Sequence, residues 1–141
     1  MTTSNQPAAT SQWTDLVRQA ITAREHAYVP YSNFKVGAAL LTAAGHIYTG
    51  CNIENAAYGP TVCAERVAVF KAVSEGQREF TAIAVATVNG VAPCGVCRQV
   101  LREFAPQLTV IVTNLSADYR IFTLPDLLPH SFGPEDLKRE T

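Results

Sequence analysis

The sequence predicts one α/β domain in three layers, with helices on both faces of a mixed five-stranded sheet. Segments whose apolar residues recur at helical spacing alternate along the chain with short apolar runs rich in β-branched residues. Some of these runs are almost continuously apolar, which is typical of strands that are buried on both faces. The length of 141 residues is that of a single domain.

The chain begins with a polar segment that predicts a flexible tail over residues 1–11, so the single domain would span residues 12–141. Apolar residues at helical spacing then predict a helix from Trp13 to His26. Ser11 is a suitable N-cap for this helix, and Pro30 breaks the pattern after it.

The remaining elements are predicted from their apolar runs and from the residues at their ends. Ala44-Gly45 marks the turn of a hairpin, Thr61 would cap the second helix, and Gly76 would end it. Pro93 would open the third helix, and Pro106 would end it. The expected strands are Val36–Leu41, His46–Ile53, Thr81–Val88, Thr109–Thr113 and Tyr119–Leu124, and the expected helices are Val62–Ser74 and Cys94–Phe104, with short helical pieces near Pro125–Leu128 and Pro134–Arg139.

The composition disfavours several classes of function. Only 16% of the residues are charged, below the ~25% typical of soluble domains, which favours a homo-oligomer that hides part of its surface. The net charge of -1 and the lack of a Lys/Arg cluster disfavour a nucleic-acid partner. No apolar run approaches the ~20 residues of a membrane span, and the N-terminus lacks a secretory pattern. The expected location is the cytoplasm, where thiols stay reduced.

Three cysteines form the most informative motif. Cys63 is followed by Ala64-Glu65, and a later segment reads Pro93-Cys94-Gly95-Val96-Cys97. Both segments fall at predicted strand-to-helix transitions, a common place for small-ligand sites. Three thiolates can hold Zn2+ and leave its fourth tetrahedral position open, which is typical of a catalytic site. Glu65 is then the candidate general acid/base beside the open position.

The residues around this motif leave some alternatives open. Three thiolates exceed the charge of the ion, so we expect Arg66 to donate hydrogen bonds to ligand sulfurs and restore its polarising power. Cys51, on a predicted strand, is interpreted as a small buried apolar residue, and a closed four-cysteine structural site is the alternative. A redox pair of Cys94 and Cys97 would leave Cys63 without a role. The three histidines lack metal-ligand spacing and are interpreted as surface or capping residues; they are His26, His46 and His130.

In combination these motifs resemble those of the zinc-dependent nucleoside deaminases, and most closely the small homotetrameric cytidine deaminases. The similarity runs from about Trp13 to Leu137 in the order of the family, with no motif missing. It implies the cytidine deaminase fold and a homotetramer with one Zn2+ per subunit. The matching segments are 31–39, 50–58, 61–66, 93–99 and 127–132.

The resemblance also implies how a nucleoside is bound. Asn52 and Glu54 share a strand face and would bind the ribose hydroxyls, with Glu54 accepting from the 3′-OH. An exposed polar strand face is the alternative. Phe34 would pack on the pyrimidine ring, and plain core packing is its alternative.

Three further roles follow from the resemblance. Ala64, at a helix N-terminus, would donate its backbone amide to the ring carbonyl. Tyr58 and Phe132 would reach the site of a neighbouring subunit, with ordinary packing as the alternative. The implied reaction is the hydrolytic deamination of cytidine and 2′-deoxycytidine to uridine and 2′-deoxyuridine, in pyrimidine salvage. Water adds to ring carbon 4, and Glu65 moves a proton to ring N3 and later one to the departing amine.

Three rival functions remain open on the sequence. Blasticidin-S deaminases share the size and the zinc motifs, although Phe34, Asn52, Glu54 and Phe132 favour an unmodified nucleoside. A deoxycytidylate deaminase is disfavoured because no Lys or Arg is evident to bind a phosphate. Outside the enzymes, the rival is a structural zinc-binding module that mediates interactions.

Overall fold

The structure is a computed structural model that describes residues 6–137. It has the expected α/β architecture, with a five-stranded sheet in the order β2-β1-β3-β4-β5. β1 is antiparallel to β2 and β3, β3 is parallel to β4, and β4 is antiparallel to β5, so the sheet is mixed. The strands are β1 (Gly37–Thr42), β2 (Ile47–Cys51), β3 (Phe80–Ala86), β4 (Thr109–Thr113) and β5 (Tyr119–Thr123).

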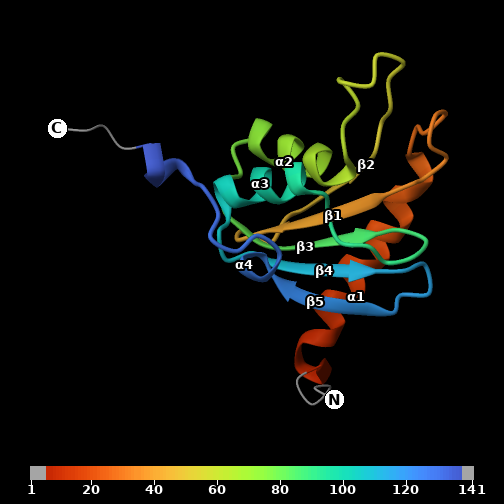
Figure 1. Cartoon of the computed structure of the whole chain (residues 1–141). Helices are drawn as coiled ribbons and strands as arrows, with labels where there is room; N and C mark the ends of the chain where they lie inside the picture. Colours follow the sequence, from red (N-terminus) through yellow and green to blue (C-terminus); the bar gives the residue numbers. More distant parts are fainter. Residues whose placement is uncertain (1–5, 138–141) are drawn as a thin grey trace.

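Helices cover both faces of this sheet (Figure 1). Side chains alternate along the central strands, so neighbouring residues such as Leu40 and Leu41 face opposite sides. Leu40 belongs to the core under α2 and α3, and Leu41 to the core under α1. The three-layer prediction is therefore confirmed. The helices are α1 (Gln6–Ala23), α2 (Ala64–Ser74), α3 (Gly95–Phe104) and α4 (Leu124–Leu127), with 3-10 turns at Arg24–His26 and Pro134–Leu137.

Two glycines allow the helices to approach the sheet edge closely. A side chain at Gly37 would meet the backbone of α1 and of Arg24, whose nitrogen lies 2.6 Å from the Cβ position. A side chain at Gly50 would meet α2, with the Ala68 nitrogen 2.7 Å from the Cβ position. Gly50 thus lets the N-terminal turn of α2, which follows Cys63, lie directly against β2.

The starts of two helices differ from the prediction. α1 begins at Gln6, so the backbone is helical through Ser11, which was expected to cap it, while residues 1–5 of the expected tail lie outside the described residues. α2 begins at Ala64 with Cys63 as N-cap, whereas Thr61 was expected to cap it. The Thr61 hydroxyl instead accepts a hydrogen bond of 3.0 Å from the backbone N–H of Asn55, which closes the preceding loop.

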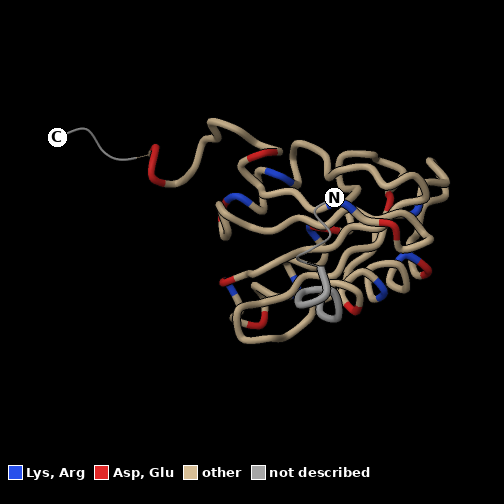
Figure 2. Tube along the Cα trace, turned by 90° about the horizontal axis from the view of Figure 1, so that it is seen from below, with Lys and Arg blue, Asp and Glu red and all other residues tan. Residues whose placement is uncertain are grey.

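The other described strand and helix boundaries agree with the prediction within three residues, and the predicted end of the last helical piece at Arg139 lies outside the described residues. β2 ends at Cys51, and Ile53 instead forms isolated bridges with Tyr28 and Val62. Figure 2 shows basic and acidic residues interspersed along the described chain. None of the helices described between residues 6 and 137 is long and apolar enough to cross a membrane.

Candidate active site

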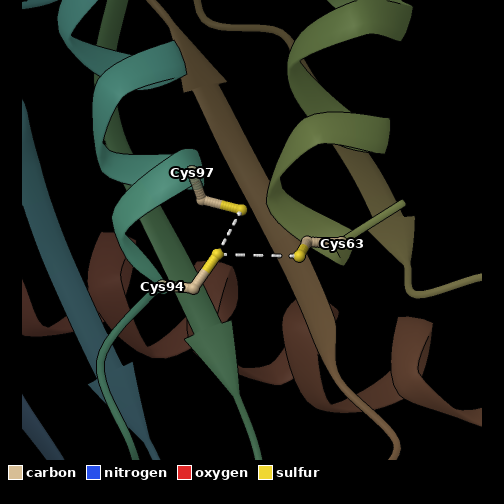
Figure 3. Close-up of side chains that lie close together, drawn as sticks. All are labelled: Cys63, Cys94 and Cys97. Atoms are coloured by element: carbon tan, nitrogen blue, oxygen red, sulfur yellow. Dashed lines mark hydrogen bonds between the residues drawn. The ribbon is translucent and has the colours of Figure 1, made fainter. Parts of the chain in front are cut away.

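Three cysteine sulfurs converge between the N-termini of α2 and α3 (Figure 3). Cys63 is the N-cap of α2, Cys94 is the N-cap of α3, and Cys97 lies one turn further along α3. The sulfur of Cys94 is 3.8 Å from that of Cys63 and 3.5 Å from that of Cys97. The partial positive charge at both helix N-termini stabilises thiolates at this place.

The donor set fits zinc. Tetrahedral Zn–S bonds of about 2.3 Å would place sulfurs about 3.8 Å apart, close to the observed spacing. Among the described residues, the metal-binding group holds no His, Asp or Glu and no fourth cysteine. Cys51 lies outside it on β2, half-buried where full burial was expected. A closed four-cysteine site is therefore not what the described residues form.

Arg66 contacts the metal-binding group as expected. Its Nη2 donates a hydrogen bond of 3.3 Å to the sulfur of Cys63. Interaction with the Cys97 thiol, together with this guanidinium, lowers the pKa of Cys63 to about 5. Arg98, beside Cys97 in sequence, instead donates to the carbonyl oxygens of Pro93 at 2.7 Å and Leu127 at 2.6 Å.

Glu65 is a buried carboxyl beside the sulfurs. It is the second residue of α2, is only 4% exposed, and still lines the cavity described below. Burial, together with the neighbouring Cys63 thiolate, raises the pKa of Glu65 to about 7. A carboxyl of that pKa can both accept and release a proton near neutral pH, which is what a general acid/base requires.

A cavity of about 340 Å³ opens beside the sulfurs. This volume is within the range of small-ligand pockets. It brings together six of the residues predicted for the site, while Cys97, the third cysteine, is fully buried and does not line it. The six are Phe34, Asn52, Glu54, Cys63, Glu65 and Cys94.

Asn52 and Glu54 make different contacts within this cavity. The Asn52 amide accepts from the N–H of Val36 at 2.9 Å and donates to the carbonyl of Phe34 at 2.8 Å. Both polar atoms of Asn52 thus hold the backbone on either side of Lys35, in addition to the sugar contact predicted for it. Glu54 accepts three hydrogen bonds from the Tyr31–Ser32 segment, and the one from the Ser32 hydroxyl lowers the pKa of Glu54 most.

Three of the residues predicted to contact the substrate do not line the cavity. Ala64 is fully buried as the first residue of α2. Tyr58 and Phe132 are 71% and 55% exposed, and the Tyr58 ring lies edge-on to that of Tyr31 with centroids 5.9 Å apart. The Phe132 carbonyl accepts from the side chain of Gln99 on α3 at 2.8 Å.

Sequence reasoning missed the other half of the wall. Ser32 lies inside the matched segment 31–39 and carries a hydroxyl, which was the available signal. The aliphatic wall residues lie just before β1, at the end of β3 and in the loop before α3, and nothing in their side-chain chemistry identifies them as site residues. The missed residues are Ser32, Val36, Val85, Thr87, Val91 and Ala92.

Comparison with known proteins places this geometry in a family. Residues 10–113 match the family model of the cytidine and deoxycytidylate deaminase zinc-binding region. The chain is 55% identical over 125 residues to a cytidine deaminase of Sporosarcina psychrophila, covering 86% of this chain and 92% of that protein. It is 44% identical over 130 residues to a cytidine deaminase of Mycobacterium tuberculosis, covering 91% and 95%.

A solved structure agrees with these relatives. The crystal structure of cytidine deaminase from Burkholderia pseudomallei matches with a TM-score of 0.82 and 52% identity, covering 84% of this chain and 98% of that one. The family match spans the cysteine motifs that form the metal-binding group. The chain therefore belongs to the family of zinc-binding cytidine and deoxycytidylate deaminases.

Proposed function

We propose that the chain catalyses the hydrolytic deamination of cytidine and 2′-deoxycytidine to uridine and 2′-deoxyuridine, with release of ammonia. One observation carries the proposal: a buried carboxyl, Glu65, lines a nucleoside-sized cavity whose wall also holds two of three clustered cysteines. Relatives named cytidine deaminases share 55% and 54% of the aligned residues.

Zinc held by Cys63, Cys94 and Cys97 would polarise a water molecule and lower its pKa. The chain itself supplies the proton transfers. Glu65 accepts a proton from the water as the water oxygen bonds to ring carbon 4, and it delivers this proton to ring N3. It then takes the remaining proton of the hydroxyl on carbon 4 and delivers it to the amine, which leaves as ammonia while the ring carbonyl forms. Protonation of N3 makes ring carbon 4 electrophilic, so one carboxyl serves both the addition of water and the loss of ammonia.

The cavity supplies the substrate contacts. Phe34 packs on the pyrimidine, and Glu54 accepts from a ribose hydroxyl while Asn52 contributes to the same subsite. The backbone N–H of Ala64 donates to the ring carbonyl from the start of α2. Within the described part of the chain, the cavity wall contains no Lys or Arg, which favours a nucleoside over a nucleotide phosphate.

The proposal also covers the oligomeric state and the cellular location. We infer a homotetramer with one zinc ion per subunit, in which Tyr58 and Phe132 complete the site of a neighbour. Arg66 offsets the charge of the thiolates through its bond to Cys63. A site built on free thiols suits a reducing compartment, so we place the enzyme in the cytoplasm, in pyrimidine salvage.

The direct test measures ammonia release from cytidine and zinc content on the same sample. The wild-type protein should hold about one zinc per chain and release ammonia. Glu65→Gln should keep its zinc and lose about 10²–10⁴-fold in kcat, the usual contribution of a general acid/base. Cys63→Ala should lose the metal itself, because a ligand is gone.

Comparison substrates decide between the rivals. Cytidine and 2′-deoxycytidine should be turned over much faster than blasticidin S or 2′-deoxycytidine 5′-phosphate, followed by loss of ultraviolet absorbance. Normal turnover by Glu65→Gln would contradict its role. Tightly held zinc without ammonia release from any of these compounds would favour the structural module instead.

A further inference from the structure

Ser32 joins the part of the cavity assigned to the sugar with the part assigned to the base. Its hydroxyl oxygen accepts a hydrogen bond of 3.0 Å from the backbone N–H of Phe34, and it also contacts Oε2 of Glu54. An ionised carboxylate only accepts hydrogen bonds, so the hydroxyl proton must point toward Glu54. One side chain therefore connects Phe34 and Glu54, and all three line the cavity.

One acceptor position of the Glu54 carboxylate has no hydrogen-bond donor among the described residues. Oε1 accepts from the backbone N–H groups of Tyr31 at 2.9 Å and Ser32 at 3.1 Å. Oε2 accepts from the Ser32 hydroxyl. A carboxylate offers about four lone-pair positions, so the fourth belongs to Oε2, the oxygen that Ser32 orients.

The loop that carries Ser32 is itself closed by hydrogen bonding. The backbone N–H of Asn33 donates to the carbonyl of Val29 at 3.0 Å, which closes a turn over residues 29–33 that contains Pro30. Asn33 has a φ of 58°, a left-handed conformation that Asn tolerates better than most residues. Ser32 is thus held in place by its own backbone before any substrate arrives.

We propose that Ser32 is a positioning residue: its hydroxyl orients Glu54 so that Oε2 presents one acceptor to a ribose hydroxyl, and it links that acceptor to the backbone of Phe34. This inference rests on the proposed function. It has a specificity consequence, because the orientation of Glu54 by Ser32 affects binding only when the substrate carries the hydroxyl that Glu54 accepts, which we assign to the 3′ position.

The test compares Ser32→Ala and Ser32→Thr with the zinc-loaded wild-type enzyme, on cytidine, 2′-deoxycytidine and 3′-deoxycytidine. Ser32→Ala should raise KM about tenfold for the two substrates with a 3′-OH, the usual effect of losing a hydrogen bond to a charged group. It should change KM for 3′-deoxycytidine, and kcat for all three, by less than about twofold. Ser32→Thr restores a hydroxyl and should return KM toward the wild-type value.

A double variant and a matched control complete the design. In a Glu54→Gln background, Ser32→Ala should add little, because the group it orients has already changed. Ser74→Ala removes a serine hydroxyl that binds a backbone carbonyl at the end of α2, away from the cavity, and should leave all KM values unchanged. Zinc content and melting temperature are measured for every variant.

These measurements test the role of Ser32 and the proposed function separately. Three results for Ser32→Ala would overturn the role of Ser32: equal rises in KM for cytidine and 3′-deoxycytidine, no rise in KM at all, or a full effect in the Glu54→Gln background. In each case, turnover of cytidine by the wild-type enzyme would leave the proposed function intact. A wild-type enzyme that releases no ammonia from cytidine would overturn the proposed function, and the role of Ser32 with it.

Discussion

Two arginines follow the metal-binding cysteines closely in sequence, yet they do different things. Arg66 donates to the sulfur of Cys63, whereas Arg98 donates to two backbone carbonyls that join the segment before α3 to the end of α4. Arg66 lies three residues after Cys63 and returns to its sulfur over one turn of α2. Arg98 lies four residues after Cys94, but its guanidinium donates to the carbonyls of Pro93 and Leu127 instead of to a sulfur.

We therefore expect replacement of each arginine by Ala to cause a different defect. Arg66→Ala should keep its zinc and lower kcat by about 10- to 100-fold, because a hydrogen bond to a charged ligand is worth about 1.5–3 kcal/mol. Arg98→Ala should lower the melting temperature more than Arg66→Ala does, because two carbonyls lose their donor. Zinc content, kcat and thermal unfolding check both. Unchanged turnover in Arg66→Ala would contradict charge compensation by this residue.

At the level of single residues, the sequence predicted chemistry better than geometry. The three cysteines and Glu65 are chemically distinctive, and their spacing identified them. The contacts of Asn52 with Val36 and Phe34, and that of Ser32 with Glu54, were not predictable, because these partners lie 16 to 22 residues apart in the sequence. Such contacts depend on how a loop and a strand meet in space, which no local pattern encodes.

Among the elements, the approach of α2 to β2 positions Cys63 and Glu65. Gly50 lies where a Cβ would contact the backbone of α2, with the Cβ of Val67 at 3.0 Å from the added atom. Neither backbone can move far, because β2 is paired with β1 along its length and α2 packs into the core. The first turn of α2 is thus fixed by the absence of a side chain on the strand.

Gly50→Ala should consequently disturb the metal-binding site from a distance. Overpacking of this kind costs about 1–3 kcal/mol, and a shift of α2 would move the Cys63 sulfur away from those on α3. We expect a lower melting temperature and weaker zinc retention against a chelator. Gly59→Ala, where nothing lies within 4 Å of the added Cβ, is the matched control. Equal behaviour of the two variants would show that the contact is not limiting.

Element types were predictable, and some helix starts were not. The apolar runs identified all five described strands because the strands are short and the central strands β1, β3 and β4 are buried on both faces. The start of α2 was misplaced because Thr61, a good N-cap residue, bonds Asn55 in the loop instead. The early start of α1 was missed although Pro7 stands near its first turn, where proline is favoured.

For the whole molecule, several large apolar side chains are exposed on the described surface. Tyr28, Tyr31, Ile53 and Tyr58 are between 44% and 71% exposed and lie in the segments that lead to the cavity-lining residues. The loop between β2 and α2 and the segment from the end of α4 to residue 137 both project from the domain (Figure 1). Apolar surface on projecting segments is typical of contacts between subunits, which agrees with the proposed tetramer.

If Phe132 acts in a neighbour's site, two defective variants should complement each other. Phe132→Ala keeps its own Glu65 but supplies a damaged contact, so its homo-oligomer should be at least about fivefold less active. Glu65→Gln is inactive itself but still supplies Phe132. In co-expressed mixed oligomers, purified through two different tags, Phe132→Ala subunits would sit beside Glu65→Gln neighbours and regain activity. The mixed sample should therefore exceed the mean of the two parent samples. Activity equal to that mean would show that each chain completes its own site, and full activity of Phe132→Ala alone would show that the site does not need Phe132.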